Sequence, residues 1–489
     1  MSLIRLLSIP FLTAFIILVV RWPRKMMRSI FIAGGSLLAV AGWLLVFHWD
    51  FKSRVFALNE NLMMDPVSAI FVLLIVSVGF LSNIYASGYL FKEGPLELPL
   101  GKLKRYSFFF YIFLFTMLLT VLSNNLGLMW IAIEATTLAS TFLVNVDDKK
   151  SSIEAAWKYL ILCTVGIALA LFGVILVYYS IALNAGGQEA SLNWTVLMEK
   201  AKLLDPKIIK LAFIFILVGF GTKAGLAPFH SWLPDAHSQA PSPVSAMLSG
   251  ILLSCASFCL LRCHLLTKAV TDSSFSNGLL ILFGVFSVAV AVPFILEQID
   301  YKRVLAYSSV EHMGLVAIGL GIGGPWGNYG ALLHIINHAF TKSLLFFCAG
   351  HLLYQYQTKK IKEIRGILRK DAFLGSIFFL AILAIAGMPP FSIFLSEFFI
   401  LTAGFLARKF FICGLLLFFL ALIFAGLLRH VSAMTFGSYN GGPLLKRNIL
   451  MDGVLGIGLI LILIMGFYIP SPLHELIRQA SRVLGGNIP

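Results

Sequence analysis

The sequence predicts an all-α polytopic membrane protein with about 14 transmembrane helices, in which two inverted five-helix repeats each contain a broken helix. Three observations predict this fold class. Hydrophobic residues make up 59% of the 489 residues and charged residues 12%, which is more apolar surface than a water-soluble chain can bury. Apolar runs of roughly 20 residues, enough to cross about 30 Å of hydrocarbon, recur along the chain. Charged and imidazole side chains nevertheless occur inside some of these runs, where they mark functional sites.

The apolar runs divide the chain into expected transmembrane spans. In chain order these are 3–20, 29–48, 65–87, 107–123, 127–146, 158–180, 208–227, 241–262, 276–296, 303–323, 329–354, 373–400, 410–428 and 449–470. The first run lacks the charged n-region and the cleavage site of a signal peptide, so we expect it to remain as a mature helix. No stretch is long and polar enough for a separate soluble domain.

An internal repeat divides this membrane domain. Three landmarks recur in the same order, namely an acid, a lysine, and a proline break followed by an acid. The matching pairs are Glu134 with Glu311, Lys158 with Lys342, and Pro228–Asp235 with Pro390–Glu397. We expect an N-terminal three-helix segment at 1–106, repeats at 107–265 and 266–440, and a C-terminal helix with a short tail at 441–489.

The repeats are expected to be inverted relative to each other. They cover the fourth to eighth and the ninth to thirteenth spans, and an odd number of helices turns the second unit upside down. The proline breaks fall in the seventh and twelfth spans. Inverted repeats with broken helices are typical of transporters.

The formal net charge of +15 has its explanation in membrane orientation rather than in nucleic-acid binding. Lys and Arg are concentrated in short loops between spans, and the alternate loops that begin with Arg21–Arg28 hold 21 of them against 13 in the opposite set. Because cytoplasmic loops are enriched in positive charge, we expect a multi-pass protein of the cytoplasmic (inner) membrane. Both termini are then expected outside the cytoplasm.

Two clusters of titratable residues predict a path for protons. The segment Gly221–Gly250 carries a lysine, two histidines, an aspartate and four prolines. In the eleventh span, His334, His338 and Lys342 lie four residues apart and share a helix face. Histidine titrates near neutrality, which suits a proton relay, whereas a single histidine in this span would more often be a hydrogen-bonded core residue.

The six cysteines predict no bound metal or cofactor. All of them lie in apolar segments, and the stripe Cys255, Cys259 and Cys263 is better explained by small residues packing between membrane helices than by a metal site. The sequence has no iron–sulfur motif, dinucleotide fingerprint or pair of haem ligands. We therefore expect no catalytic centre in this chain, and the energy for transport must come from partner subunits.

Three segments resemble a known family. They are GTKAGLAPFHSWLPDAHSQAPSPVSAMLSG at 221–250, His334–Lys342 and Gly387–Glu397. They resemble the antiporter-like membrane subunits shared by respiratory complex I, Mrp cation/proton antiporters and energy-converting hydrogenases, over roughly residues 60–440. The segments 157–173 and 307–314 are most similar to the large antiporter-like subunit of hydrogenase 4 and formate hydrogenlyase.

The resemblance implies a proton-translocating subunit of a membrane-bound redox complex, such as a group 4 [NiFe] hydrogenase or formate hydrogenlyase type assembly. It implies other membrane subunits and a peripheral redox arm as partners, with the NiFe and iron–sulfur centres held by those partners. In the family, a glutamate on the fifth span pairs with a lysine at the seventh-span break, and the twelfth span carries a terminal ionisable group, which is lysine in some members and glutamate in others. Glu397 matches this group and is the expected exit-side acid. The implied path residues are Glu134, Lys223, His334, His338, Lys342 and Glu397.

Seven further residues are secondary candidates. They are Lys158, His230, Asp235, His237, Ser254, Glu311 and His312. Lys158 matches a family lysine, but at the start of its span it can instead snorkel to the interface. His230, Asp235 and His237 follow the seventh-span break and form either a proton entrance or a cap of the turn. Glu311 and His312 form a candidate relay between the two halves.

Ser254 marks a departure from the family pattern. Many relatives carry a lysine on the eighth span, where this chain reads Leu252-Leu253-Ser254. Water would have to bridge the central step at a hydroxyl. The hydrogenase-type subunits also lack this lysine, so the difference favours that subfamily.

Three functions remain open from the residues. The first is proton translocation within a redox complex. The second is a sodium/proton antiporter module or a proton-driven partner of another transport system, although sodium needs more oxygen ligands than the breaks provide. The third is a structural spacer, which does not explain the density of intramembrane charge.

Overall fold

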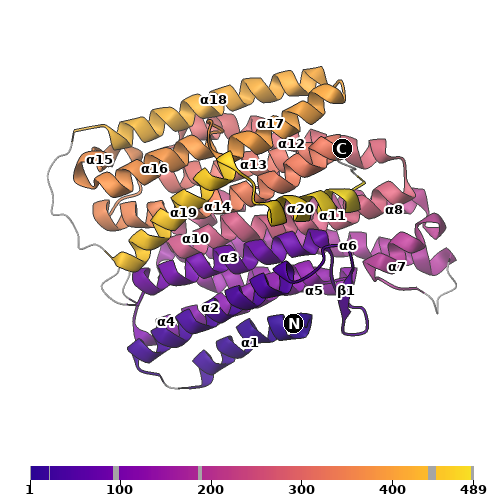
Figure 1. The fold of residues 1–489 in the computed structure, drawn as a ribbon, viewed down its shortest axis with the longest axis horizontal. Helices are drawn as coiled ribbons and strands as arrows, with labels where there is room; N and C mark the ends of the chain where they lie inside the picture. The colour runs from indigo at the N-terminus through magenta and orange to yellow at the C-terminus, as the bar shows by residue number, and fades with distance from the viewer. Residues whose placement is uncertain (1, 21, 92–97, 185–189, 439–447, 486–489) are drawn as a thin grey trace.

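The computed structural model describes residues 2–20, 22–91, 98–184, 190–438 and 448–485. Its helices run side by side along one direction, from α1–α4 at the bottom of Figure 1 to α16–α18 at the top. Within the described residues, eleven helices are long and apolar enough to cross a membrane, and three shorter apolar helices accompany them. The predicted class, a polytopic helical membrane protein, is confirmed.

The helices have the following bounds. The long ones are α2 (Arg24–Phe47), α3 (Pro66–Tyr89), α4 (Leu100–Leu122), α5 (Leu126–Val144), α6 (Lys150–Asn184), α12 (Ser273–Glu297), α13 (Tyr301–Ile322), α14 (Gly324–Tyr356), α18 (Phe410–Thr435), α19 (Ile449–Phe467) and a run made of α10 (Ser242–Met247), a π-helical turn (Leu248–Leu252) and α11 (Leu253–Val270). The shorter apolar ones are α1 (Leu3–Val19), α16 (Ala372–Ile385) and α17 (Ser392–Leu406).

The remaining elements connect or cover these helices. They are α7 (Trp194–Glu199), α8 (Pro206–Ala224), α9 (Trp232–Gln239), α15 (Ile367–Lys370), α20 (Ser471–Val483), two 3-10 turns (Ala201–Leu203 and Ile361–Glu363), and an antiparallel hairpin of β1 (Val55–Ala57) and β2 (Leu62–Met64). Each predicted span overlaps a helix, and the predicted span 373–400 holds both α16 and α17. The total of 14 spans, the repeats and the four-part division stay predictions.

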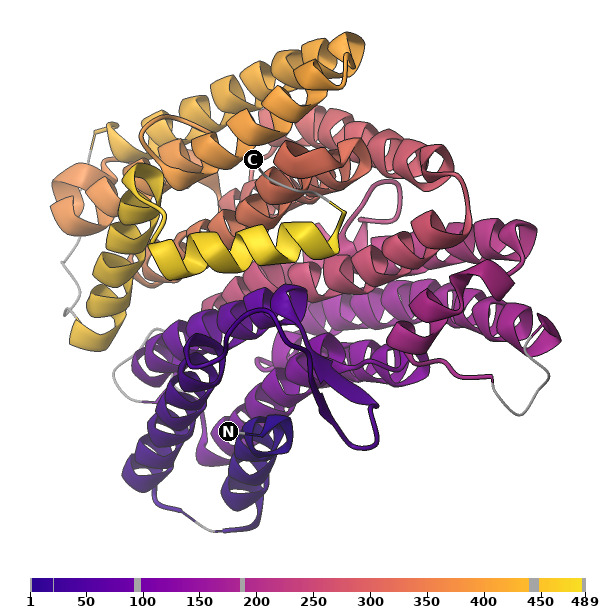
Figure 2. The same ribbon diagram turned by 45° about the vertical axis from the view of Figure 1, so that its right-hand side comes forward.

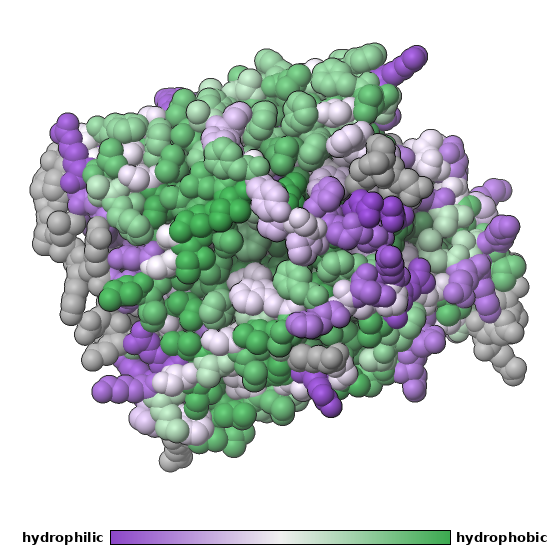
Figure 3. Space-filling view, viewed as in Figure 1, coloured by the Kyte–Doolittle hydropathy of each residue, from purple (hydrophilic) through white to green (hydrophobic). Residues whose placement is uncertain are grey.

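The surface agrees with a membrane environment. Figure 3 shows hydrophobic residues over most of one face, while hydrophilic residues gather toward its two ends and over the region of α20. The residues 471–483, which the sequence analysis treated as a tail, form the amphipathic helix α20 against α3 and α14. Of the basic loop residues used for orientation, Arg21, Lys92, Lys446 and Arg447 lie outside the described residues.

Both predicted breaks interrupt helical geometry at a glycine. Gly225 follows α8 with φ +79°, and Gly387 follows α16 with φ +74°, a left-handed conformation that glycine adopts without the usual Cβ penalty. Each break continues into a cis peptide bond, at Ala227-Pro228 and Pro389-Pro390. Backbone groups that leave a helix inside a membrane are tolerated where protein or water surrounds them, so the breaks are suited to polar chemistry.

The most deeply buried helices form the centre of the molecule. Helices α13, α14 and the α10–α11 run lie between the N-terminal and C-terminal helices, as the two views in Figures 1 and 2 show. The α10–α11 run approaches α14 so closely that a Cβ on Gly250 would lie 2.7 Å from Ser343 Oγ and 2.9 Å from Ala339 O. The π-helical turn beside this contact inserts one extra residue into the run, a feature common at functional sites.

A buried ion pair fastens the N-terminal helices to this centre. Arg262 on α11 donates two hydrogen bonds to Asp65, at 2.7 and 2.6 Å, and both side chains are almost completely buried. The rings of Trp194 and Phe258 flank the guanidinium at 4.6 and 4.9 Å. Asp65 also caps α3 by accepting a hydrogen bond from Ser68 N, so one carboxylate serves both the cap and the pair.

We expect Asp65→Asn to destabilise the protein strongly. Asparagine caps a helix as well as aspartate does, so the substitution removes the charge and leaves Arg262 buried without its counter-ion. Breaking a buried pair in this way costs about 3–5 kcal/mol, measured as a lower melting temperature of the detergent-solubilised protein. The matched control is Asp272→Asn, at the exposed cap of α12, and an equal fall in both variants would contradict the role of the pair.

Candidate functional site

The first group of buried polar side chains surrounds Lys223, in the last turn of α8. Its side chain is fully buried, and Nζ donates hydrogen bonds to Thr137 Oγ1 at 2.6 Å and to the Tyr159 hydroxyl at 3.0 Å. The Tyr159 ring also faces the ammonium, with its centroid 5.0 Å from Nζ. Lys223 is therefore held by neutral hydroxyl groups and an aromatic face.

Glu134 is joined to Lys223 through a single hydroxyl group. Thr137 Oγ1 donates to Glu134 Oε2 at 3.1 Å while it accepts the hydrogen bond from Lys223. Thr164 Oγ1 donates to the other carboxylate oxygen, Oε1, at 2.9 Å. The pairing that the resemblance implied is thus indirect in this structure. Sequence reasoning missed Thr137, although its place one helical turn after Glu134 was a usable signal.

Lys158 lies apart from this group in a surface network. Its Nζ is 2.6 Å from Glu154 Oε1 and 3.4 Å from Asp235 Oδ2, and half of its side chain is exposed. Asp235 also pairs with Arg303. This geometry is typical of a lysine whose side chain reaches the membrane interface. The sequence analysis gave that interpretation of Lys158 as the alternative to a residue of the proton path.

The second group of titratable residues lies on α14. His334, His338 and Lys342 are fully buried, as expected for residues on one face of a central helix. Lys342 Nζ donates to the Leu305 carbonyl at 2.6 Å and to Ser308 Oγ, both on α13. Like Lys223, Lys342 is held by neutral oxygen atoms rather than by a carboxylate.

Two imidazole groups and one hydroxyl group form a hydrogen-bonded chain across three helices, and a third imidazole lies beside it. Ser396 Oγ on α17 lies 3.0 Å from His334 Nδ1, and His334 Nε2 lies 3.0 Å from His312 Nδ1 on α13. The ring of His338 is 5.4 Å from that of His312, centroid to centroid. The structure therefore brings the predicted relay residue His312 into the same group as the predicted path residues His334 and His338.

Two acids complete the second group. One oxygen of Glu311, one oxygen of Glu397 and one nitrogen of His312 lie within 4.8 Å of one another. All three side chains are buried. Glu397 packs directly against the break, because a Cβ on Gly387 would overlap its Oε2. The structure thus places a primary and two secondary candidates together at the second break.

The other candidates near the first break are less closely connected. His230 contacts the rings of Phe294 and Tyr307, at 6.5 and 6.0 Å between centroids. His237 is fully buried and stacks on Phe346 at 5.0 Å. The Ser254 hydroxyl, also buried, donates to the Gly250 carbonyl of its own helix at 3.1 Å.

No hydrogen bond connects the Lys223 group with the α14 group among the residues described. His237 lies against the second half, because its ring stacks on that of Phe346 on α14. Neither ring nitrogen of His237 has a protein partner there. Water is the remaining means of connecting such groups.

A polar cavity of about 340 Å³ opens on the side of the basic loops. Asp147, Lys302 and Lys359 are among its lining residues. Lys302 Nζ donates to the Ala240 carbonyl at 2.7 Å, and burial lowers the pKa of Lys359 below the usual value for lysine. Sequence reasoning missed these residues because it assigned both lysines to membrane orientation.

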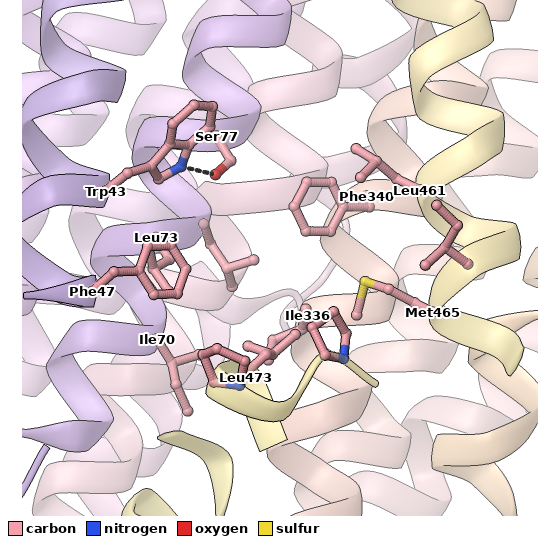
Figure 4. A pocket seen from close by; sticks show the side chains of 14 residues that line it. Trp43, Phe47, Ile70, Leu73, Ser77, Ile336, Phe340, Leu461, Met465 and Leu473 are labelled. Carbon is pink, nitrogen blue, oxygen red and sulfur yellow. Dashed lines mark hydrogen bonds between the residues drawn. The ribbon is translucent and has the colours of Figure 1, made fainter. Parts of the chain in front are cut away.

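A second cavity, of about 280 Å³, lies between α3, α14 and α19 and is lined mainly by apolar side chains. Figure 4 shows Ile336 and Phe340 of α14 facing Leu461 and Met465 of α19 across it. The polar group drawn there, Ser77 Oγ, already accepts a hydrogen bond from Trp43 Nε1 at 2.9 Å. This cavity offers dispersion contacts rather than proton transfer.

We expect Gly387→Ala to be more destabilising than Gly485→Ala. Both glycines have positive φ, +74° and +82°, so each alanine carries a backbone cost of about 1–2 kcal/mol. At Gly485 no atom lies within 4 Å of a Cβ, whereas at Gly387 the Cβ displaces the Glu397 carboxylate.

Thermal unfolding of the two variants measures this difference. Adding Glu397→Ala to Gly387→Ala should recover the excess loss, because the overlapping oxygen is then absent. Equal melting temperatures for the two single variants would contradict the contact between Gly387 and Glu397.

The fold and these residues define a polytopic membrane protein with buried titratable groups at two broken helices, the arrangement of ion-translocating membrane proteins. Comparison with known proteins agrees with this class. Residues 123–424 match the family described as NADH:quinone oxidoreductase/Mrp antiporter, transmembrane. Residues 49–95 match NADH-ubiquinone oxidoreductase (complex I), chain 5 N-terminus. The chain belongs to the NADH:quinone oxidoreductase/Mrp antiporter family of membrane subunits.

Individual relatives refine the comparison. The chain is 37% identical to the hydrogenase-4 component F homolog of Methylacidiphilum infernorum over 425 residues, which cover 86% of this chain and 88% of the relative. Its fold is similar to a chain of the archaeal membrane-bound sulfane sulfur reductase, with a TM-score of 0.86, 23% identity and coverage of 99% and 97%. A chain of the Mrp complex from Dietzia sp. gives a TM-score of 0.84, 16% identity and coverage of 99% and 96%. The protein is an antiporter-like subunit of the complex I, Mrp and hydrogenase-4 type.

Proposed function

We propose that this chain carries protons across the cytoplasmic membrane as a subunit of a group 4 [NiFe] hydrogenase or formate hydrogenlyase type assembly. The observation that carries the proposal is the contact chain of buried titratable side chains on α13, α14 and α17, next to a helix break. Similarity to a hydrogenase-4 component F homolog supports the choice of assembly. Both termini lie on the non-cytoplasmic side, and a peripheral redox arm holds the NiFe and iron–sulfur centres.

In the first half, the proton moves between Lys223 and Glu134 through Thr137. The Lys223 ammonium gives a proton to the Thr137 hydroxyl, which releases its own proton to Glu134 Oε2. The products are a neutral amine and a carboxylic acid, so the charges cancel within the membrane. Removing the buried charge of Lys223 lowers the desolvation cost of this state, and a nearby positive charge reverses the transfer.

In the second half, imidazole groups lie between Lys342 and the acids at the break, and water bridges the steps that lack a direct hydrogen bond. His338 lies beside His312, and His312 Nδ1 contacts His334. Glu311 and Glu397 lie close to the His312 ring. Each imidazole accepts a proton on one nitrogen and releases one from the other, so the set passes a proton toward Glu397 without a change in net charge.

The polar cavity supplies protons from the cytoplasmic side. It is lined by Lys302 and Lys359, and its lining includes Ser238, the neighbour of His237. His237 then passes protons to the α14 group. Electron transfer in partner subunits drives the cycle by changing the charge near the two lysines, since a neighbouring charge shifts the proton affinity of a buried group.

The test of this function is redox-driven proton uptake by proteoliposomes that contain the purified native assembly. We expect Lys223→Ala and Lys342→Ala each to lower the pumping rate by about 100-fold, the scale of losing a proton-transfer group. The matched control is Lys207→Ala, an exposed lysine at the other end of α8, which should pump normally. Normal pumping in both buried-lysine variants would refute the relay, and loss only upon sodium withdrawal would identify a sodium/proton antiporter module.

Two adjacent threonines test the hydroxyl bridge. We expect Thr137→Val to lower pumping by about 100-fold, because valine has the same shape and no hydroxyl, and Thr137→Ser to restore it. The control is Thr136→Val, since the Thr136 hydroxyl donates to the Ile133 carbonyl of its own helix and contacts neither charged group. Equal rates in Thr137→Val and Thr136→Val would rule out the bridge.

A further inference from the structure

A three-residue cluster at the second break has the composition of a metal site. It consists of Glu311 and His312 on α13 and Glu397 on α17, with one ligand atom from each within 4.8 Å of the others. The side chains are 1%, 0% and 8% exposed. Carboxylate oxygen and imidazole nitrogen are the ligands that zinc and similar divalent cations accept.

Two atoms of the cluster have no partner in the protein. Glu311 Oε2 and His312 Nε2 are buried and make no hydrogen bond among the described residues. A buried acceptor without a partner costs about 1–3 kcal/mol. Both residues belong to the set that converges with Glu397, so each brings an atom that a cation can use.

The hydrogen bonds around the cluster fix the state of His312. Ser396 Oγ donates to the Ile393 carbonyl at 2.8 Å, so it accepts from His334 Nδ1. His334 Nε2 is then an acceptor and receives the hydrogen bond from His312 Nδ1. In the neutral ring this leaves a lone pair on His312 Nε2, the nitrogen that lacks a protein partner.

The charge that the cluster can develop suits a divalent cation. Lys342 donates to α13 oxygens rather than to either acid. When a cation displaces the protons of both carboxyl groups, two carboxylates and a neutral imidazole carry two negative charges. A divalent cation makes that set neutral, whereas a monovalent one leaves a net charge in a low-dielectric interior, which is costly.

The break lies directly beside the cluster. Gly387 is the residue next to the Glu397 carboxylate, and it has no side chain to cover it. The following residues, Met388, Pro389 and Pro390, are exposed in the isolated chain. Glu397, at 8% exposed, is the least buried of the three ligands.

We propose that Glu311, His312 and Glu397 bind a divalent transition cation of the Zn²⁺ class. Three protein ligands with a fourth position for water match an open zinc site. The cation occupies the lone pair of His312 Nε2, which is the position that a proton must use in the relay. In this last step the inference rests on the proposed function, and bound Zn²⁺ then stops proton translocation.

The first test measures Zn²⁺ bound to the purified full-length protein by equilibrium dialysis. We expect Glu397→Gln and Glu311→Gln each to lower the affinity for one bound Zn²⁺ ion by about 100-fold. The matched control is Glu363→Gln, at an exposed acid far from the cluster in sequence, which should bind as the wild type does. Unchanged binding in both cluster variants would overturn the site.

The second test needs no variant and so does not depend on variant folding. X-ray absorption of the wild-type protein with one equivalent of Zn²⁺ should give oxygen and nitrogen ligands at about 2.0–2.2 Å, including one imidazole. A sulfur ligand, or a shell without imidazole, would overturn the proposal. His312→Gln should remove the imidazole signal, while His264→Gln, at a buried histidine on α11, should keep it.

Zn²⁺ titration of proton pumping separates the site from the proposed function. Inhibition with the affinity found by dialysis supports both. Binding at the cluster without any effect on pumping supports the site and contradicts the relay through His312. Intact pumping with no Zn²⁺ bound at the cluster overturns the site and leaves the proposed function standing.

Discussion

The absence of water from the hydrocarbon is the constraint on which this structure depends. A charge or a free backbone group there must be satisfied by the protein itself. The chain meets this requirement by surrounding its buried lysines with hydroxyl and carbonyl oxygens and by placing several titratable residues beside two breaks that begin at Gly225 and Gly387. The Asp65–Arg262 pair obeys the same rule, with two hydrogen bonds and two aromatic rings around one guanidinium.

The two halves satisfy their buried lysines in a similar way but differ in what surrounds them. Lys223 and Lys342 both donate to neutral oxygens. Near Lys223 the further groups are hydroxyls and one carboxylate, whereas near Lys342 they are imidazoles and two carboxylates. In the proposed relay, a hydroxyl bridge transmits a proton between fixed partners, while an imidazole also stores one, so the relay of the second half has the larger capacity for protons and for cations that replace them.

The sequence was sufficient to predict the helical membrane fold, both breaks and the α14 stripe. These features are local: apolar runs, glycine and proline, and the spacing of His334, His338 and Lys342 all act within one helix. The sequence did not predict the contacts between helices. The bridge through Thr137, the convergence of Glu311 and His312 with Glu397, and the pair of Asp65 with Arg262, 197 residues apart, depend on how each helix is rotated and shifted against its neighbours. Hydropathy does not encode that rotation.

The Thr137 hydroxyl has a consequence for timing. The Thr137 hydroxyl has one hydrogen, which it donates to Glu134, while its oxygen accepts a hydrogen bond from Lys223. After a proton has passed, the remaining hydrogen points back at Lys223, and the hydroxyl must rotate about its C–O bond before it can serve again. Side-chain rotation of this kind is fast compared with helix motion. In the proposed relay, the Thr137 hydroxyl therefore passes one proton per rotation, and the same rotation serves transfer in either direction.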